Sequence, residues 1–381
     1  ECKLEEVSTV QTGPFGSQLH QSDYQLVGTP IITVEHLGEN KILHQNIPLV
    51  SDEDKERLNK YVLEEGDIVF SRVGSVDRRA YVSKNEEGWM FSGRCLRVRV
   101  NKEIVDPKYL SYYFGQESFK EHIRMIAVGA TMPSINTEIL SGVGLNLPTL
   151  PEQHSIASIL SSLDDKIDLL HRQNKTLEAM AATLFRQWFM EEAHEDWEDG
   201  TLGEAVEIFD GQRIPLSRME RDKKKDGILY PYYGAAQIMD YINDYIFDGE
   251  YILLGEDGTV RTDEGYPVLQ FATGKFWVNN HTHVLKAKAP YSNFFLWNYL
   301  SRTNIDEIVT GAVQPKINQG NLKSLVFPRC PKNLVVEFNR ITEPVLAKIQ
   351  HNKSQIAGLE ELRDTLLPKL MSGEVRVVLD L

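Results

Sequence analysis

The chain contains Gly129-Ala130-Thr131-Met132-Pro133-Ser134-Ile135-Asn136, and a second version follows in its other half as Gly311-Ala312-Val313-Gln314-Pro315-Lys316-Ile317-Asn318. Both copies combine a flexible glycine, a rigid proline and short polar side chains in the pattern Gly-Ala-x-x-Pro-x-Ile-Asn. Two interpretations are open: the segment is the hinge into the helix that follows, or it touches a nucleic acid. In either case its recurrence at one place in each half indicates a duplicated unit.

The repeat extends beyond this segment. Asp67–Val76 aligns with Tyr251–Val260, and Gly13 matches Gly211, in both cases at a slightly larger offset than the first pair of segments. Loop insertions produce such small drifts in offset. The sequence therefore predicts two halves that share a plan and differ in their loops.

Each half is predicted to be a globular part followed by one long helix. Short β-rich runs, such as Ile68–Phe70 and Tyr251–Leu254, alternate with Gly, Asn, Asp and Pro turn signals. Two aromatic helical patches, Lys108–Gly115 and Asn293–Ser301, are expected to pack on the strands. The predicted fold class is α+β, with globular domains over residues 1–150 and 193–331 and helices over residues 151–192 and 332–381.

The two long helices carry an apolar seam. Pro151 suits the N1 position of the first helix, and its seam residues alternate spacings of four and three, the 3.5-residue period of a coiled coil. They are Ile156, Leu160, Leu163, Ile167, Leu170, Asn174, Leu177, Ala181, Leu184 and Trp188. The second helix repeats the seam as Phe338, Val345, Ile349, Asn352, Ile356, Leu359, Leu366 and Leu370, with Thr342 and Arg363 as interruptions. Two such seams favour a pair over two independent amphipathic helices.

The charge of the chain counts against a nucleic-acid binder. With 381 residues, 41% of them apolar and 25% charged, the chain is long enough for two globular units, and its net charge is −14. Residues 151–200, which include the acidic connector Glu191–Gly200, carry four Lys/Arg against eleven Asp/Glu. Residues 201–331 are nearly balanced, with fourteen against sixteen. Local basic patches remain compatible with this distribution, and partner subunits are expected to supply much of the attraction for phosphate.

The cellular compartment is predicted from three scattered cysteines, Cys2, Cys95 and Cys330. Their spacing fits neither a disulfide framework nor a zinc site, which favours a reducing cytoplasm. The first residues are too polar for a signal peptide, and no run of eighteen apolar residues exists. We expect a cytoplasmic chain without a membrane partner.

Motifs of catalysis are missing from the sequence. It has no phosphate-binding Gly-x-x-x-x-Gly-Lys-Ser/Thr loop, no Gly-x-Gly-x-x-Gly and no His-Glu-x-x-His. The nearest match to an amino-methyltransferase motif, Asp106-Pro107-Lys108-Tyr109, lacks the second proline. Glu256 and Asp257 lie between two glycines and are better explained by a polar turn. We therefore predict no catalytic residue, no metal site and no cofactor on this chain.

Several loops have the composition of a DNA reader, which needs polar side chains for base edges and basic residues or backbone amides for phosphates. In the first half the candidates are Gly13, Ser17, Gln18, Arg72, Gly74, Arg78, Arg79, Arg94, Thr131, Ser134 and Asn136. In the second half they are Gln212, Arg213, Lys223, Lys224, Lys225, Tyr232, Tyr233, Gln237, Arg261, Asn279, His281, Gln314, Lys316 and Asn318. A structural ion pair and a guanine contact are both open at Arg72 and Arg94. The lysine run also fits a solvated loop.

These motifs, taken in order, resemble the specificity subunit of Type I restriction–modification systems. In the first half the resemblance is carried by residues 129–136, 147–157 and 184–189, and in the second by residues 232–235, 252–259, 311–318 and 362–375. It runs from end to end of the chain. Departures are the breaks in the second seam and Pro328-Arg329-Cys330-Pro331, where the first half has Pro148-Thr149-Leu150-Pro151.

The resemblance implies a DNA-binding chain that does not catalyse. Two target-recognition domains would each read one half of a gapped, asymmetric double-stranded sequence, and the helices would pack antiparallel as a spacer. Two modification subunits would bring S-adenosylmethionine and methylate adenine, and restriction subunits would join to cut unmodified DNA; S-adenosylmethionine and ATP are thus expected on the partners. One rival is a fused methyltransferase–endonuclease, which the missing catalytic motifs disfavour. The other is a coiled-coil scaffold without a DNA role, which the duplicated loops disfavour.

An antiparallel pair of helices leads to a specific prediction about two asparagines. Asn174 lies as far after Ile156, the start of the first seam, as Asn352 lies before Leu370, the end of the second. End-for-end superposition of the two seams then puts both amides in one layer, where they can share a hydrogen bond. At about 1.5 Å per residue each seam makes a rod of roughly 50 Å, about one to one and a half turns of DNA.

Overall fold

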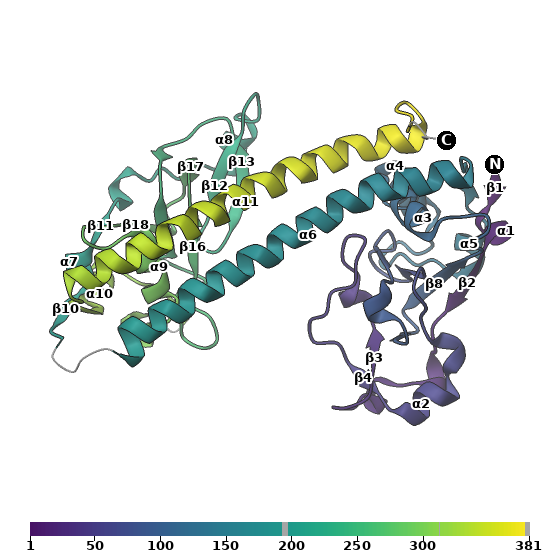
Figure 1. Ribbon diagram of the computed structural model, residues 1–381, viewed down its shortest axis with the longest axis horizontal. Helices are drawn as coiled ribbons and strands as arrows, with labels where there is room; N and C mark the ends of the chain where they lie inside the picture. Colours follow the sequence, from purple (N-terminus) through teal and green to yellow (C-terminus); the bar gives the residue numbers. More distant parts are fainter. Residues whose placement is uncertain (193–196, 312, 378–381) are drawn as a thin grey trace. The chain divides into compact units, whose positions relative to one another are not determined.

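The computed structural model (Figure 1) describes residues 1–192, 197–311 and 313–377, without the side chain of Ser17. By its internal contacts the chain divides into two units: unit 1 comprises Glu1–Leu169 and Gln355–Leu381, and unit 2 comprises Leu170–Ser354. Each unit therefore combines one globular part with one half of each long helix. Residues 193–196 of the predicted acidic connector lie outside the described residues.

Unit 1 is a mixed α+β unit built on an antiparallel sheet of order β2-β8-β5-β6, with a smaller sheet of order β4-β3-β7 and the pair β1-β9. Its strands are β1 Cys2–Lys3, β2 Ser8–Thr12, β3 Thr29–Ile32, β4 Leu49–Val50, β5 Ile68–Ser71, β6 Arg79–Tyr81, β7 Met90–Phe91, β8 Cys95–Val100 and β9 Gly144–Leu145. Its short helices are α1 Leu4–Val7, α2 Asp52–Arg57, α3 Pro107–Tyr113, α4 Glu117–Ile126 and α5 Thr137–Ser141.

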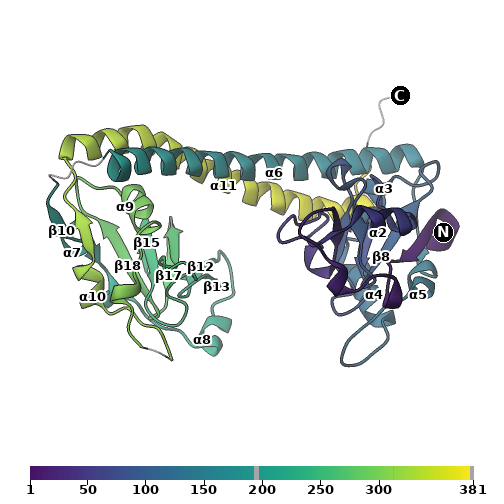
Figure 2. The same ribbon diagram turned by 90° about the horizontal axis from the view of Figure 1, so that it is seen from below.

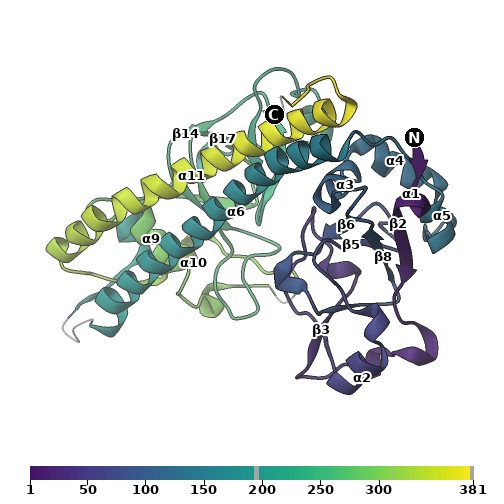
Figure 3. The same ribbon diagram turned by 45° about the vertical axis from the view of Figure 1, so that its right-hand side comes forward.

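The larger sheet of unit 1 is buried on both faces. Alternate residues of β5, Ile68 and Phe70, join one apolar cluster with α3 and α4, whereas Val69 joins a second cluster with β3 and β7. Figure 3 shows α3 and α4 at one end of the unit and β3 and α2 at the other, with the sheet between them. Burial on both faces explains the continuous apolar run in β5.

Unit 2 repeats this plan. Its main sheet has the order β11-β18-β15-β16, and a second sheet has the order β13-β12-β17-β14. The strands are β10 Asp199–Thr201, β11 Val206–Ile208, β12 Tyr230–Tyr233, β13 Ile238–Ile242, β14 Phe247–Asp248, β15 Tyr251–Gly255, β16 Leu269–Ala272, β17 Lys275–Val278, β18 Thr282–Ala287 and β19 Val326–Pro328. The short helices are α7 Leu202–Ala205, α8 Arg218–Asp222, α9 Asn293–Leu300 and α10 Gln319–Ser324. The matching strand order confirms the duplication.

The long helices are α6 Leu150–Arg186, which ends in a π-helical turn over Gln187–Glu191, and α11 Lys332–Ser372. In unit 2 they cover α9, which lies between them and the sheet (Figure 2). Ala181 of α6, Phe294 of α9 and Ile349 of α11 share one buried cluster. In unit 1, Leu160 and Leu370 pack together with Tyr109 of α3.

The predicted seam is largely the buried face of both helices, with one change of register. Ile156, Leu160, Ile167 and Leu170 are each at most 5% exposed. Near the end of α6, however, Phe185 and Phe189 are the buried residues, and Leu184 and Trp188 are only partly buried. The prediction of Leu184 and Trp188 as seam residues was wrong in this respect, because the last turns of α6 pack into the aromatic core of unit 2 and not along a coiled-coil seam.

The two asparagines of the seam meet in unit 2. The Asn352 Nδ2 donates to the Asn174 Oδ1 at 2.8 Å, and both side chains are buried. The predicted contact is confirmed. Because Ala181, which follows Asn174, shares a cluster with Ile349, which precedes Asn352, the two helices run antiparallel in this unit. The Oδ1 of Asn352 has no hydrogen-bond partner among the described residues.

The two interruptions of the second seam are both satisfied by polar contacts. Thr342 is 2% exposed, and its hydroxyl donates to the carbonyl of Phe338, one turn earlier. In unit 1 the Nη1 of Arg363 lies 2.9 Å from the Oδ1 of Asp164 on α6, whose other oxygen accepts from the Tyr112 hydroxyl. Although burial opposes the charge, hydrogen bonds to Asp164 and Asp364 raise the pKa of Arg363. A salt bridge thus replaces an apolar seam contact here.

Candidate nucleic-acid interface

The repeated segment forms the same tight turn in both units. In unit 1, Val128 and Ser134 exchange two backbone hydrogen bonds, and in unit 2 Thr310 and Lys316 do the same. The turn needs glycine, because Gly129 and Gly311 have φ angles of 108° and 88°. A Cβ at these positions would also lie only 2.7 and 2.3 Å from a backbone carbonyl oxygen.

This turn is tied to the loop that follows the central strand of each sheet. In unit 1 the Gly74 amide donates to the Pro133 carbonyl and the Ile135 amide to the Arg72 carbonyl, at 2.8 and 2.9 Å. In unit 2 the amides of Gly258 and Ile317 make the equivalent bonds, at 3.0 and 2.8 Å. Ile135 and Ile317 anchor the turn in the core. Two loops distant in sequence are thereby held as one rigid edge.

The asparagine at the end of the segment has a local role. The side chains of Asn136 and Asn318 accept from the amides of Ile139 and Asn321 at 2.8 Å, so each asparagine caps a short helix, α5 or α10. The hydroxyl of Ser134 likewise donates back to Val128. The segment therefore leads into a short helix and is not the hinge of a long one. At the tip of the segment, Thr131 and Met132 in unit 1 and Val313 and Gln314 in unit 2 are exposed.

In unit 1 two arginines face each other at this edge. Ser71 pairs with Cys95 in the antiparallel ladder of β5 and β8, and the next pair is Arg72 with Arg94, joined by a 2.8 Å backbone bond. The Arg72 guanidinium donates to the Gly93 carbonyl at 3.3 Å and lies 5.8 Å from the Phe15 ring centroid. Arg94 is exposed and has no hydrogen bond or ion pair of its side chain among the described residues. Phe15, which lies between the candidates Gly13 and Ser17, is 61% exposed.

Other candidates of unit 1 have structural roles. Arg79 is 2% exposed, donates to the Ser111 carbonyl and pairs with Glu39, so the structure does not support its predicted role as a DNA reader. A Cβ at Gly13 would lie 2.3 Å from the Ser92 carbonyl oxygen, so this glycine permits close backbone packing. Gln18 accepts from the Tyr61 hydroxyl.

Arg78 is exposed, and its guanidinium donates to the Leu37 carbonyl. The side chain of Ser17 lies outside the described residues.

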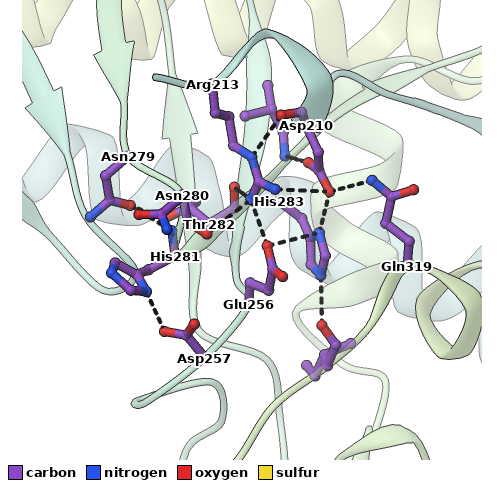
Figure 4. Close-up of polar contacts among 12 residues, drawn as sticks. Asp210, Arg213, Glu256, Asp257, Asn279, Asn280, His281, Thr282, His283 and Gln319 are labelled. Atoms are coloured by element: carbon purple, nitrogen blue, oxygen red, sulfur yellow. Dashed lines mark hydrogen bonds and ion pairs between the residues drawn. The ribbon is translucent and has the colours of Figure 1, made fainter. Parts of the chain in front are cut away.

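In unit 2 the same edge lies over a buried charge cluster (Figure 4). The Asp210 Oδ2 lies 2.6 Å from the His283 Nδ1 and accepts from Gln319 at 2.7 Å, while its Oδ1 accepts from the Val284 amide. Arg213 bonds Glu256 at 2.6 Å and the Thr282 carbonyl at 2.7 Å. The cluster brings together loop and strand positions that are far apart along the chain, which explains why the sequence did not reveal it.

The buried pair of Asp210 and His283 is held by hydrogen bonds on both sides of the imidazole ring. His283 is almost fully buried, and its second ring nitrogen, Nε2, lies 2.8 Å from the Ile317 carbonyl. Although burial of Asp210 favours its neutral form, the hydrogen bond and charge of His283 lower the pKa of that carboxyl. The two ring nitrogens of His283 therefore contact two acceptors, a carboxylate and a backbone carbonyl. The ring links the core directly to the repeated segment.

The acidic groups of the cluster already have cations. Ligand atoms of Asp210, Glu256 and His283 lie within 4.8 Å of one another, a spacing that suits a metal ion. However, Glu256 contacts Arg213 at 2.6 Å and Lys316 at 3.4 Å. The arrangement is therefore explained by internal charge pairing, which also accounts for Arg213 and Lys316. The structure does not support Arg213 as a base reader, because only 12% of its side chain is exposed.

The remaining candidates of unit 2 divide by exposure. Tyr232 and Asn279 are 1% and 6% exposed, so they are core residues and not a stacking or readout surface. Lys224 and Lys225 pair with Asp244 and Asp240, whereas Lys223 makes no ion pair among the described residues.

Further candidates of unit 2 are held at the surface. Arg261 pairs with Asp306, and His281 lies 2.6 Å from Asp257. Tyr233 is half-buried, and burial raises the pKa of its hydroxyl. The candidates Gln212, Gln237 and Gln314 are exposed, and their amide side chains make no hydrogen bond among the described residues; the same holds for Asn280, next to Asn279.

Two copies of one α+β unit, each with rigid loops at one end of its sheet and each joined to the same pair of helices, define a duplicated binding protein. The family model "Type I restriction modification DNA specificity domain" matches residues 1–179 and 194–360. The chain belongs to this family.

Individual relatives agree with the family match. The Type I restriction enzyme MjaIX specificity subunit of Methanocaldococcus jannaschii is 27% identical over 73% of this chain and 71% of its own length. The HindI specificity subunit of Haemophilus influenzae is 32% identical over 40% of this chain and 33% of its own. Among solved structures, the S subunit of a Type I restriction-modification system from M. genitalium matches with a TM-score of 0.64 at 17% identity, covering 97% of this chain and 95% of that one. This likeness shows the fold.

Within the described residues, no helix is long and apolar enough to cross a membrane.

Proposed function

We propose that this chain is the DNA-specificity subunit of a Type I restriction–modification system. Each unit reads one part of a two-part double-stranded target with the loops at the edge of its main sheet. The observation that carries the proposal is the duplication of a rigid edge: residues 71–76 and 128–135 in unit 1, and residues 255–260 and 310–317 in unit 2, are joined by equivalent backbone bonds. Membership of the specificity family supports it.

The catalytic steps are assigned to partners of this chain. Two modification subunits carry S-adenosylmethionine and methylate adenine, and restriction subunits carry ATP and cut. In support, the sequence lacks the motifs of methyl transfer and nucleotide hydrolysis. Residues 151–200 carry four basic against eleven acidic residues, a net charge that would favour association with basic partner subunits. The cytoplasm is the compartment in which such a complex meets DNA.

Selection from a randomised duplex library tests the reading function. The chain is co-expressed with the modification subunit of its own system, the complex is purified, and bound duplexes are sequenced. We expect two short blocks of fixed sequence separated by a fixed gap of unspecified bases. Replacing residues 1–150 by those of a relative should change one block and leave the other block and the gap unchanged.

Three results would contradict the proposal in different ways. A complex that assembles but shows no sequence preference would support the scaffold alternative. Changes in both blocks after the exchange of residues 1–150 would refute two separate readers. Saturable methyl transfer from S-adenosylmethionine by the chain alone, or ATP hydrolysis by it, would refute the assignment of catalysis to the partners.

A further inference from the structure

The arginines of unit 1 divide into two groups. Residues 1–150 contain eight arginines. Four of them, Arg57, Arg79, Arg99 and Arg124, pair with carboxylates, and Arg97 is buried and donates to carbonyl and amide oxygens. The other three, Arg72, Arg78 and Arg94, make no ion pair with a carboxylate among the described residues. All three lie at the edge formed by the loops between β5 and β6 and before β8.

Two of these arginines form a like-charge pair across the strands. Arg72 and Arg94 are directly opposite, because Ser71 and Cys95 are paired and the Arg72 amide donates to the Arg94 carbonyl. Opposite residues of an antiparallel pair have Cβ atoms about 4.5–5.5 Å apart and point to the same side, and like charges in this arrangement destabilise a sheet. Nothing acidic among the described residues neutralises them. The pair is therefore a donor site without an internal acceptor for its charge.

In unit 2 the side chains at the equivalent positions have partners of opposite charge within the chain. Its ladder pairs Gly255 with Thr282, so the next pair is Glu256 with His281, joined by a 2.9 Å backbone bond. Glu256 contacts Arg213 and Lys316, and His281 contacts Asp257. The fold thus does not require unpaired cations at this place.

We propose that Arg94, with Arg72 held beside it, is a specificity-determining residue that binds the major-groove edge of a guanine, so that the half-site read by unit 1 contains a guanine. This rests on the proposed function. Guanine presents two acceptors there, O6 and N7, which match the fork of an arginine. Arg72 is oriented by the Gly93 carbonyl and the Phe15 ring, which leaves the exposed guanidinium of Arg94 to meet the base.

The test uses the complex with the modification subunit and duplexes that carry its selected target. Arg94→Gln removes the charge and the fork, and its site is exposed, so the variant should fold. We expect its preference for guanine at one position of one block to fall by about 10-fold or more, the size of a bidentate contact. Replacing that guanine by 7-deazaguanine, which lacks the N7 acceptor, should weaken the unsubstituted complex and have little further effect on Arg94→Gln.

Matched controls distinguish base recognition by Arg94 from a general effect of removing a positive charge. Arg57→Gln removes an exposed arginine of unit 1 that is paired with Asp54, and this variant should keep the selected sequence. A uniform loss of affinity for all sequences in Arg94→Gln, rescued by Arg94→Lys, would assign the pair to phosphate and overturn the proposal. An unchanged preference would also overturn it. If the unsubstituted complex selects no sequence, the proposed function itself has failed.

Discussion

The two units place opposite chemistry on one scaffold. At the facing positions of the central ladder, unit 1 has Arg72 and Arg94, without carboxylate partners among the described residues, whereas unit 2 has Glu256 and His281, each already paired. The two units also differ at the buried ladder position two residues further along the same strand. The position of Leu96, which is fully buried in unit 1, is occupied in unit 2 by His283.

This difference shows how a duplicated reader can diverge without a change of fold. The backbone bonds that hold the edge loops are kept in both units, and they involve amides and carbonyls, which depend little on side-chain identity. Side chains that face out of this frame are free to change. When a buried apolar residue is replaced by a polar one, however, a neighbouring residue must also change to supply a hydrogen-bond partner. His283 and Asp210, which contact each other in the core of unit 2, are such a pair.

The largest effect is expected from His283→Leu, which gives unit 2 the side chain that unit 1 has at this place. The substitution removes the contact of His283 with the buried Asp210 carboxylate and leaves Arg213, 3.7 Å away, as its charged partner. We expect the free energy of unfolding of unit 2 to fall by about 3 kcal/mol. Urea unfolding followed by tryptophan fluorescence reports on this, because four of the five tryptophans belong to unit 2.

The matched control for His283→Leu is a double variant. His283→Leu combined with Asp210→Thr reproduces the pair Thr12 and Leu96 of unit 1 and should recover much of the lost stability. If the single variant were as stable as the unsubstituted chain, the contact between Asp210 and His283 would not contribute to the stability of unit 2, and this prediction would be wrong.

A smaller effect is expected at the helix pair. Asn352→Leu leaves the Asn174 amide buried against an apolar side chain, and we expect a loss of about 1–3 kcal/mol, measured by thermal unfolding of the full chain. The double variant Asn174→Leu, Asn352→Leu should recover this loss and exceed the original stability, because the Asn352 Oδ1 has no partner to lose. A double variant no more stable than the single one would contradict a direct pair.

Sequence periodicity was sufficient to predict those parts of the molecule that depend on regular spacing. The duplication followed from matching segments, and the contact of Asn174 with Asn352 followed from their distances to the seam ends. The helix contact depends on the heptad spacing of the seam, which can be read directly from the sequence. Phe185 and Phe189 escaped the prediction because the core of unit 2 changes the buried face of α6 there.

Loop side chains were predicted less well, because residue type does not reveal burial. Arg79 and Arg213 are of a residue type that DNA readers use, yet each forms a salt bridge within the chain. Tyr232 and Asn279 are buried. Partners such as Glu39 and Glu256 lie far along the chain from the arginines that they bind, and only the folded chain brings them together. A prediction from loop composition therefore names more residues as DNA contacts than the folded loop exposes.

The acid response should differ between the units. Because the folded-state pKa of Asp210 is lowered, its ionised form contributes stability above the unfolded pKa of about 3.8, and this contribution is lost as the pH falls through the folded value. We expect the stability difference between the unsubstituted chain and Asp210→Asn to be constant near neutral pH and to shrink below about pH 4. Urea unfolding at stepped pH values measures it. A difference that grew on acidification would contradict the ion pair.

The smallest effect is expected at the lysine run of unit 2, where the contrast between paired and unpaired cations recurs within the run. Lys223 has no ion pair among the described residues, while Lys224 and Lys225 are held by Asp244 and Asp240. If the run contacts the DNA backbone, Lys223→Ala should lower affinity equally for all sequences and reduce the slope of log affinity against log salt by about 1. Lys224→Ala should change that slope less, because the charge it removes is already balanced by Asp244. Equal slopes for the two variants would mean that internal pairing does not decide which cations reach the phosphates, and the same argument would then lose force at Arg72 and Arg94.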